Sequence, residues 1–588
     1  MRASRYGNRL CQALQRCCGL MRVRLGGIVE RQVAPTPPGG ASPMVGPRRP
    51  RARPALLTAL GAALALLACL CSAEAAGYAC HPDGKKCCPP GWKCGGGMQA
   101  CGPGGYKMPS WMYGCKGESW NWNRLPMDWS YAGYRAGEKE IPWHPQSVDV
   151  KALGAKGDGA TDDTWAVEKA VAQAWGGSAV FFPPGKYVIT RKIDIRKGIV
   201  LRGAGRDKTT LYFPKSLAEV YGNWGGWGHG TCFINFWGWN PVRDDQTRLA
   251  TVTANSPKGS QKVFVDNPGR VQKGSWVRVV LQDSADALKS NLMGGLMEAG
   301  WPGSGARNVV RFSSRVKEVG PGGQITLERP LPWEVKTQWG PVLHAVKPSI
   351  NEAGVEALTF EFKWTKYPGH LKENGYNALH MNQMGNSWVR DVRFVNADTA
   401  VYLWGTVFST VQDVEIDVTS DRGSPTRDFW SGLDRSGHRG VWAEFGENNL
   451  FTRIAFKAPF FHDFTVATAE HGSVLSKSWG RDLNLDFHKG APWGNLYTDL
   501  DLGAGTRAFK SGGGAGAGPN SASYQTFWNL RAAQPLQLPD NSFGPQLNFV
   551  GVQTRDSASA RVAVRWMQDG GGFPQNLWLS MRQKRLGW

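Results

Sequence analysis

The stretch Val148–Ile189 reads VDVKALGAKGDGATDDTWAVEKAVAQAWGGSAVFFPPGKYVI and decides the fold. It predicts a strand from Val148, a turn at Gly157-Asp158-Gly159, a helix whose apolar positions run from Trp165 to Ala174, and strands on either side of Pro183-Pro184-Gly185. Glycine permits the positive φ of the turn. The short oxygen side chains of residues 161–163 suit a helix N-cap. We therefore interpret Asp158, Asp162 and Asp163 as capping residues rather than chemical ones.

This segment resembles the opening of the pectate-lyase-like superfamily, the family of rhamnogalacturonases and pectate lyases. The resemblance rests on GDGATDDTWAVEKAV, FFPPGKYVIT and IVLRGAGRDKTTLYF (Ile199–Phe213). It implies an all-β chain, a single-stranded right-handed parallel β-helix. It implies little about the reaction, because the matching segment is a structural cap.

A repeat of short apolar strands continues from Val355. The strand starts Trp388 and Thr410 are 22 residues apart, Leu450 and Val474 are 24 apart, and Val474 and Leu496 are 22 apart. One such step is one turn of a parallel β-helix. The wider steps contain loops, which leave the coil without breaking its stacking.

Residues 214–346 interrupt this rhythm and predict a β-rich insertion. Turn residues separate five apolar runs, Leu249–Ala254, Lys262–Val265, Ser275–Leu281, Val309–Val319 and Gln324–Leu327, as in a small sandwich or barrel. Asp283–Gly305 is a candidate lid. The predicted divisions are a leader (1–76), a cysteine-rich module (77–116), a Trp/Pro-rich connection (117–147), the first coils (148–213), the insertion (214–346), the main coils (347–556) and a C-terminal cap (557–588).

The first 76 residues are typical of a secretory leader. The apolar run Leu56–Leu70 follows four arginines and precedes the small residues Ser72–Ala76, as in a signal peptide. Met44 is an alternative start, and a signal anchor is the rival interpretation. We therefore expect a secreted protein, extracellular or in a cell wall, without a membrane span after cleavage.

The chain is basic. Its net charge is +22, and 11 Arg against 2 Glu in residues 1–75 account for nine of these charges, which leaves +13. A basic secreted protein suits an acidic polysaccharide as its partner. Nucleic acid is not expected, because no recognition motif is present. The sequence gives no indication of oligomeric state.

Six cysteines fall within 36 residues that hold little apolar material, and we expect them to form disulfides. They are Cys80, Cys87, Cys88, Cys94, Cys101 and Cys115. Such a segment cannot build a core and needs covalent links. The spacing is similar to that of hevein-like chitin-binding modules, so carbohydrate binding is an alternative to a purely structural role. Cys232 is either a buried thiol or a partner for this group.

Ionisable residues occur at matching offsets on successive coils and predict a site. His462 and Asp463 follow Leu450 by 12–13 residues, and Asp486 and His488 follow Val474 by 12–14. These four are the candidate catalytic residues, since neighbouring coils lie about 4.8 Å apart. The candidate substrate-binding residues are Tyr402, Trp404, Glu444, Arg481 and Lys489.

Two chemistries fit these residue types. A lyase removes the proton next to the carboxylate of a uronate, which needs a base such as His462 or His488 and a cation such as Arg481 or Lys489. Calcium is a possible substitute for that cation, although no cofactor is required. A hydrolase needs two carboxylates about 5–5.5 Å or about 6.5–9.5 Å apart, for which Asp463 and Asp486 are candidates.

Lyase action on an acidic, uronate-containing glycan is the leading hypothesis. Hydrolysis by the paired aspartates is the alternative, and a wall or matrix protein that binds polysaccharide without cleaving it is the third. The polygalacturonase motifs do not occur together: Gly228-His229-Gly230 is present, but without its partners and within the insertion.

Overall fold

The computed structural model forms two units, Met1–Cys94 and Gly95–Trp588. It describes residues 79–80, 87–88, 109–120, 122–222, 231–239, 247–281, 287–294, 310–423, 435–514, 517–539, 543–555, 566–569 and 571–587. In the first unit, β1 (Ala79–Cys80) pairs antiparallel with β2 (Cys87–Cys88). The predicted leader lies outside the described residues. In the second unit Cys115 is disulfide-bonded.

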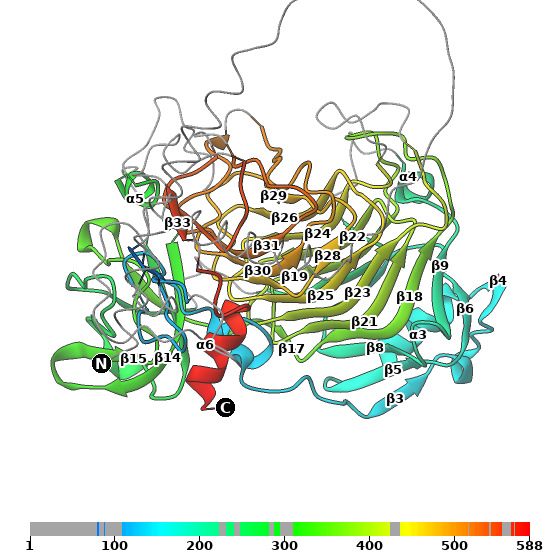
Figure 1. The fold of residues 1–588 in the computed structure, drawn as a ribbon. Helices are drawn as coiled ribbons and strands as arrows, with labels where there is room; N and C mark the ends of the chain where they lie inside the picture. Colours follow the sequence, from blue (N-terminus) through cyan, green and yellow to red (C-terminus); the bar gives the residue numbers. More distant parts are fainter. Residues whose placement is uncertain are drawn as a thin grey trace, which may run out of the picture. The chain divides into compact units, whose positions relative to one another are not determined.

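The second unit is a parallel β-helix (Figure 1). Its long sheet follows the order β3 (Gln146–Asp149), β5 (Ser178–Phe182), β8 (Ile199–Gly203), β18 (Gly354–Phe362), β21 (Trp388–Val395), β23 (Thr410–Asp417), β25 (Leu450–Phe456), β27 (Val474–Ser476), β30 (Leu496–Asp501), β31 (Thr526–Arg531), β32 (Leu547–Val550) and β33 (Trp566–Asp569). The short strands β4 (Asp158–Asp162), β6 (Gly185–Val188), β9 (Thr209–Phe213) and β28 (Trp479–Gly480) belong to the same sheet. Crossovers between parallel strands are right-handed, so the predicted fold class is confirmed.

A second sheet of seven parallel strands closes each coil. Its order is β29 (Leu485–Phe487), β26 (His462–Ala467), β24 (Arg439–Glu444), β22 (Thr399–Trp404), β19 (Asn377–Asn382), β10 (Ile234–Trp237) and β7 (Ile193–Ile195). A narrow third side holds β17 (Ile350–Asn351), β20 (Met384–Gly385) and single parallel bridges through Val407, Glu447, His471 and Trp493. We call the first two the long and the short sheet.

The predicted spacing of the coils is confirmed by the register of the long sheet. Trp388 pairs with Thr410, which pairs with Leu450, and the series continues through Val474 and Leu496. The interior is apolar and its rings stack from coil to coil. Centroid distances are 5.0 Å between Phe360 and Phe394 and 4.9 Å between Phe527 and Phe549. Burial of this continuous stack stabilises the solenoid.

The three aspartates of the opening stretch cap backbone, as predicted. Asp158 Oδ1 accepts from the amides of residues 160 and 161, and Asp162 Oδ1 accepts from Thr164 N at 3.0 Å, the first residue of α3 (Thr164–Gln173). Asp163 accepts instead from the amides of residues 156 and 157, at 2.6 and 3.0 Å. All three carboxylates hold the entry to the first coil.

The insertion is an antiparallel six-stranded sheet of β11 (Arg248–Thr251), β12 (Lys262–Phe264), β13 (Trp276–Leu281), β14 (Val310–Val319), β15 (Gln324–Leu327) and β16 (Val342–Ala345). It begins later than the predicted boundary at 214. β10 pairs in parallel with β7 and β19 and is therefore part of the β-helix. The predicted lid lies largely outside the described residues, apart from α5 (Ala287–Leu292) and the two residues after it.

A buried ion pair fastens this insertion to the coils. Arg278 donates to Glu447 Oε1 from Nη2 at 2.7 Å, and both side chains are 2% exposed. His471 Nε2 lies 3.2 Å from the other oxygen of Glu447. Removing either partner of such a pair leaves a buried charge uncompensated.

The Trp/Pro-rich connection runs along the coils. Trp129 Nε1 donates to the carbonyl of Gly494, Tyr134 N donates to Thr410 Oγ1, and Arg390 donates to the carbonyl of residue 142. The C-terminal helix α6 (Leu577–Leu586) packs against this segment, and Arg585 donates to carbonyls of residues 130 and 136. β33 shows that the coils extend beyond the predicted end at 556.

One further expectation, the state of Cys232, is settled by the described residues. Cys232 is a buried free thiol whose pKa is raised by burial. None of the described helices, α4 (Leu217–Tyr221) included, is long and apolar enough to cross a membrane.

Candidate active site

Polar and aromatic side chains form a row across the short sheet. His380, Tyr402 and Trp442 occupy register-matched positions on β19, β22 and β24, and the row continues through Thr465 to Asp486. The rings of His380 and Tyr402 stack at 4.6 Å, and those of Tyr402 and Trp442 at 4.0 Å. His380 and Tyr402 are buried, whereas Trp442 is half-buried. Thr465 and Asp486 are buried as well, so Trp442 is the accessible member of this row.

Asp486 joins two imidazoles at this end of the row. Its Oδ2 lies 3.0 Å from His488 Nδ1 and 3.3 Å from His462 Nδ1. The side chains of His462 and Asp486 are at most 2% exposed, whereas that of His488 is 23% exposed. The structure thus brings together three of the four predicted catalytic residues, with His488 facing outward.

The remaining hydrogen bonds of Asp486 hold it in place. Thr465 Oγ1 donates to Oδ2 at 2.9 Å, and Gly512 N donates to Oδ1 at 2.8 Å. Burial raises the pKa of Asp486, but the attraction of His462 and His488 outweighs burial, so the pKa lies below its usual value. Asp486 is therefore an ionised acceptor held through both of its oxygens, and it is suited to orienting an imidazole.

Glu444 is a carboxyl group of the opposite character. Tyr402 Oη donates to its Oε1 at 2.5 Å, and Thr468 Oγ1 lies 3.4 Å from Oε2. Burial raises the pKa of Glu444, against the lowering effect of the Tyr402 hydrogen bond. Two carboxyls whose pKa values are pushed apart are candidates for different proton-transfer roles.

Arg439 supplies a cation beside His488. Its guanidinium lies 3.8 Å from the centroid of the Trp442 ring, and its Nη2 lies 3.5 Å from His488 Nε2. An arginine keeps its charge even when it is buried, as this one is. The sequence interpretation missed Arg439, which begins β24 three residues before Trp442.

A second group of imidazoles adjoins His462. His370 and His438 have ring centroids 4.8 Å apart, and those of His438 and His462 are 5.6 Å apart. His438 Nδ1 lies 3.1 Å from Glu373 Oε1. The only signal for these residues in the sequence is that six of the ten histidines fall between 370 and 488.

Asp463 does not belong to the site, which corrects its predicted role. Its Oδ2 accepts from Arg507 Nη2 at 2.6 Å and from Asn484 N at 2.9 Å, and its Oδ1 accepts from Phe460 N. Burial raises its pKa, opposed by the charge of Arg507. Successive side chains of a strand point in opposite directions, so Asp463 and His462 cannot face the same site.

One of the two predicted cations, Arg481, lies away from the site. Arg481 is exposed just after β28 of the long sheet, so it cannot clamp a substrate beside His488. Lys489 follows His488 and is half-buried, with a left-handed backbone at φ 68°. Trp404 is half-buried, in register with Glu444 and 5.4 Å from the Phe445 ring. Lys489 and Trp404 thus remain next to the site.

The cluster can hold a metal, but its donors do not suit calcium. The ligand atoms of His370, His438 and His462 lie within 4.8 Å of one another, as do those of His462, Asp486 and His488. Calcium prefers six to eight oxygen ligands. Imidazole nitrogens suit zinc, copper and nickel instead. His229, in the isolated Gly-His-Gly, lies outside the described residues.

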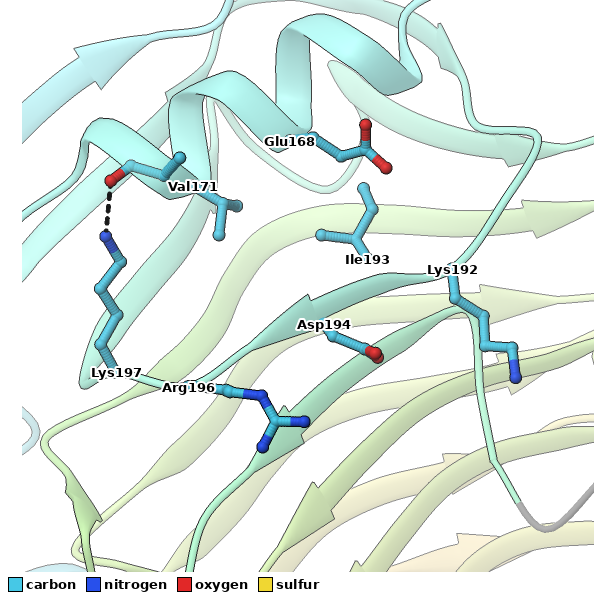
Figure 2. Close-up of a pocket in the computed structure, with 8 residues that line it drawn as sticks. Glu168, Val171, Lys192, Ile193, Asp194, Arg196 and Lys197 are labelled. Atoms are coloured by element: carbon cyan, nitrogen blue, oxygen red, sulfur yellow. Dashed lines mark hydrogen bonds between the residues drawn. The ribbon is translucent and has the colours of Figure 1, made fainter.

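A separate pocket lies at the other end of the row. It has a volume of about 490 Å³ and lies between α3 and β7. Figure 2 shows Lys192, Arg196 and Lys197 around Asp194. Asp194 is in register with Asn235 and, through it, with His380. The pocket offers charges for an anion but no imidazole–carboxylate pair, so the cluster at His488 is the stronger candidate for chemistry.

Comparison with known proteins supports this fold. Residues 147–222 match the family model described as rhamnogalacturonase A/epimerase, pectate lyase-like. The pre-neck appendage protein of Bacillus phage B103 is 44% identical over 70 residues, which is 12% of this chain and 8% of that protein. Mannuronan C5-epimerase AlgE6 of Azotobacter vinelandii is 36% identical over 80 residues, 12% of this chain and 9% of the enzyme.

The match to these curated relatives therefore spans less than a tenth of their length. Among solved structures, the tailspike protein gp49 of Pseudomonas phage LKA1 has a TM-score of 0.43 and 14% identity, over 69% of this chain and 63% of that one. The expected resemblance is confirmed: the chain is a parallel β-helix whose residues 147–222 match the rhamnogalacturonase/epimerase type of the pectate-lyase-like superfamily.

Proposed function

We propose that this protein is a polysaccharide lyase that acts on an acidic, uronate-containing glycan. The observation that carries the proposal is the Asp486–His488 pair, with Nδ1 of His488 at 3.0 Å from the carboxylate and its other nitrogen beside Arg439. A base oriented by a buried carboxylate and flanked by a cation matches the needs of proton removal next to a carboxylate.

In this mechanism His488 Nε2 takes the C5 proton of the uronate. Asp486 accepts the Nδ1–H of His488 and stabilises the imidazolium that forms, while Arg439 offsets negative charge on the substrate. The electron pair of the C5–H bond becomes the C4=C5 double bond, and the C4–O bond breaks. Glu444, whose pKa is raised by burial, gives its proton to the leaving oxygen.

The basic character of the chain supports an anionic substrate. After the predicted leader it carries +13, and the Lys192–Lys197 pocket continues the row that ends at the cluster. The relative named a mannuronan C5-epimerase adds a uronate polymer to the candidates. Epimerisation begins with the same proton removal, so it is the second candidate.

Hydrolysis fits the geometry less well. Asp463 is bound to Arg507, and both oxygens of Asp486 already accept hydrogen bonds, which disfavours a nucleophilic role. We also propose that the chain is secreted and that its cysteine-rich segment folds outside the cytoplasm. N-terminal sequencing of protein recovered from culture medium would then start near Gly77. A start at Met1 or Met44, or absence of the protein from the medium, would contradict a cleaved secretory leader.

The test is a glycan panel with polygalacturonate, alginate and a neutral glucan. A lyase raises the absorbance of unsaturated uronates, an epimerase exchanges the C5 proton with deuterated solvent without this rise, and a hydrolase creates reducing ends alone. His488→Ala and Asp486→Asn should each lower turnover by about 10²-fold or more. The matched control Asp413→Asn, at a solvent-exposed pair with Arg453 on the long sheet, should leave turnover unchanged.

Two results would overturn the proposal. One is full activity in folded His488→Ala and Asp486→Asn proteins. The other is tight binding of a uronate polymer with no new product, which would make the chain a binding protein.

A further inference from the structure

Three histidines from separate coils converge beside the proposed active site. His370 lies between β18 and β19, His438 immediately precedes β24, and His462 begins β26. The ring centroids of His370 lie 4.8 Å from His438 and 5.7 Å from His462. One nitrogen from each lies within 4.8 Å of the other two. The proposed lyase reaction uses neither His370 nor His438.

A carboxylate oxygen lies close to one nitrogen of two of these rings. His438 Nδ1 lies 3.1 Å from Glu373 Oε1, and His462 Nδ1 lies 3.3 Å from Asp486 Oδ2. Glu373 is fixed in turn by the hydroxyl of Tyr367, at 2.5 Å. A carboxylate on one ring nitrogen is the usual support for a histidine that binds metal through the other, because it fixes the tautomer and the ring orientation.

The free nitrogen of His462 points to a missing ligand. Its Nε2 is buried and, like its Nδ1, makes no hydrogen bond in the described part of the chain, although Nδ1 lies 3.3 Å from Asp486 Oδ2; the side chain is 2% exposed. An unpaired buried polar group costs about 1–3 kcal/mol. A metal ion bound by the lone pair of Nε2 would remove this cost, whereas the apolar ring of Phe461 beside His370 cannot.

We propose that His370, His438 and His462 bind one divalent transition-metal ion of the zinc class. Metal–nitrogen bonds of about 2.0–2.1 Å in a tetrahedron place the nitrogens about 3.4 Å apart. Side-chain rotation closes the remaining distance, since His370 sits on a half-exposed loop. Three protein ligands leave a fourth position for water or a substrate oxygen.

The site joins a loop to two coils next to His488. His462 belongs to the metal site and also contacts Asp486. Asp486 in turn contacts the proposed base His488, so His462 and Asp486 link the ion to the base. The proposal does not depend on the glycan, because its readout is the metal itself.

The experiment uses the full secreted chain, stripped with a chelator and titrated with Zn²⁺ by calorimetry and metal analysis. The wild type should bind one equivalent, and Co²⁺ in its place should give the visible bands of a tetrahedral site. His370→Ala, on the half-exposed loop, should fold normally and weaken binding by at least 100-fold. Glu373→Gln should weaken it by about 10–100-fold.

Two histidine variants serve as controls. His380→Gln removes a buried histidine of the same sheet that lies outside the cluster, and it should retain the ion. His488→Gln should also retain it, which separates this site from the neighbouring His462, Asp486 and His488 set. The proposal is wrong if the folded wild type binds Zn²⁺ no better than His370→Ala does, or if His488→Gln loses the ion while His370→Ala keeps it.

Discussion

The two main sheets of the β-helix have the same apolar interior but opposite outer surfaces. On the long sheet, Arg453 and Asp413 pair at 2.6 Å with side chains 47% and 41% exposed. On the short sheet, His462 and Asp486 are buried almost completely. Exposed charges are hydrated whether or not they pair, whereas buried ionisable groups must be held by specific partners.

This difference in burial distinguishes the ordinary solvated surface of the long sheet from the candidate site on the short sheet. Exposed ion pairs contribute about 0–1 kcal/mol to folding, so their identity is weakly constrained by stability. The buried imidazoles bring a desolvation cost that an apolar row would avoid. Burial lowers the pKa of His438 and His462 well below the usual value. We infer that the short sheet keeps these residues for chemistry rather than for stability.

The largest expected effect is at Glu356, a carboxylate of the long sheet that is buried like those of the short sheet. Glu356 on β18 accepts from Arg202, from Arg390 Nε at 2.7 Å and from Trp388 Nε1 at 2.8 Å. Glu356→Ala leaves the buried Arg202 uncompensated and should cost about 3–5 kcal/mol of unfolding free energy. Urea unfolding measures it.

Specific activity per folded molecule should stay unchanged in Glu356→Ala, because this carboxylate is structural. A variant that keeps its stability but loses turnover would place chemistry on the long sheet as well and erase the contrast between the two faces.

An intermediate effect is expected in the pH dependence of stability through His380. Burial lowers the pKa of His380 to about 3, while in the unfolded chain it is about 6.5. Below about pH 6.5 the unfolded state therefore binds one more proton than the folded state. The free energy of unfolding then decreases by about 1.4 kcal/mol for each unit by which the pH is lowered, as the contribution of this residue.

His380→Gln should remove that share of the slope. Urea unfolding of wild type and variant between pH 7.5 and 4.5 isolates it, because the other buried histidines are common to both proteins. Parallel stability curves for the two proteins would show that His380 titrates normally and that this row is open to water.

The smallest effect is expected at the exposed pair of the long sheet. Arg453→Ala removes a contact of two well-hydrated groups and should change the unfolding free energy by less than about 1 kcal/mol, with no change in turnover. Thermal unfolding in low and high salt gives the value. A loss above 2 kcal/mol would mean that this face is not an ordinary solvated surface.

Much of the fold was predictable because each coil repeats one pattern. The strand starts inferred at Trp388, Thr410, Leu450, Val474 and Leu496 are partners in the observed register. The start of the insertion could not be predicted correctly, because β10 has only four residues and lies between segments rich in Gly and Trp.

The candidate site was predictable only where coil length is constant. Equal offsets from the preceding strand correctly bring His462, Asp486 and His488 together. The same offset cannot say which way a side chain points, so Asp463 was misplaced. His370 and His438 come from segments of irregular length, and no spacing rule connects them to β26 before the fold is known.

The insertion delays the pairing of β8 with β18 while the chain is being synthesised. Val200 of β8 pairs with Gly354 of β18, and the chain between them contains β11–β16, which have no place in the coil. At a synthesis rate of about 5–20 residues per second, β18 leaves the ribosome roughly 8–30 s after β8. During that interval the first coils present an unpaired edge, which is the kind of surface that chaperones protect. Pairing of β18 with β8, at Gly354 and Val200, covers this edge and therefore removes the risk of aggregation there.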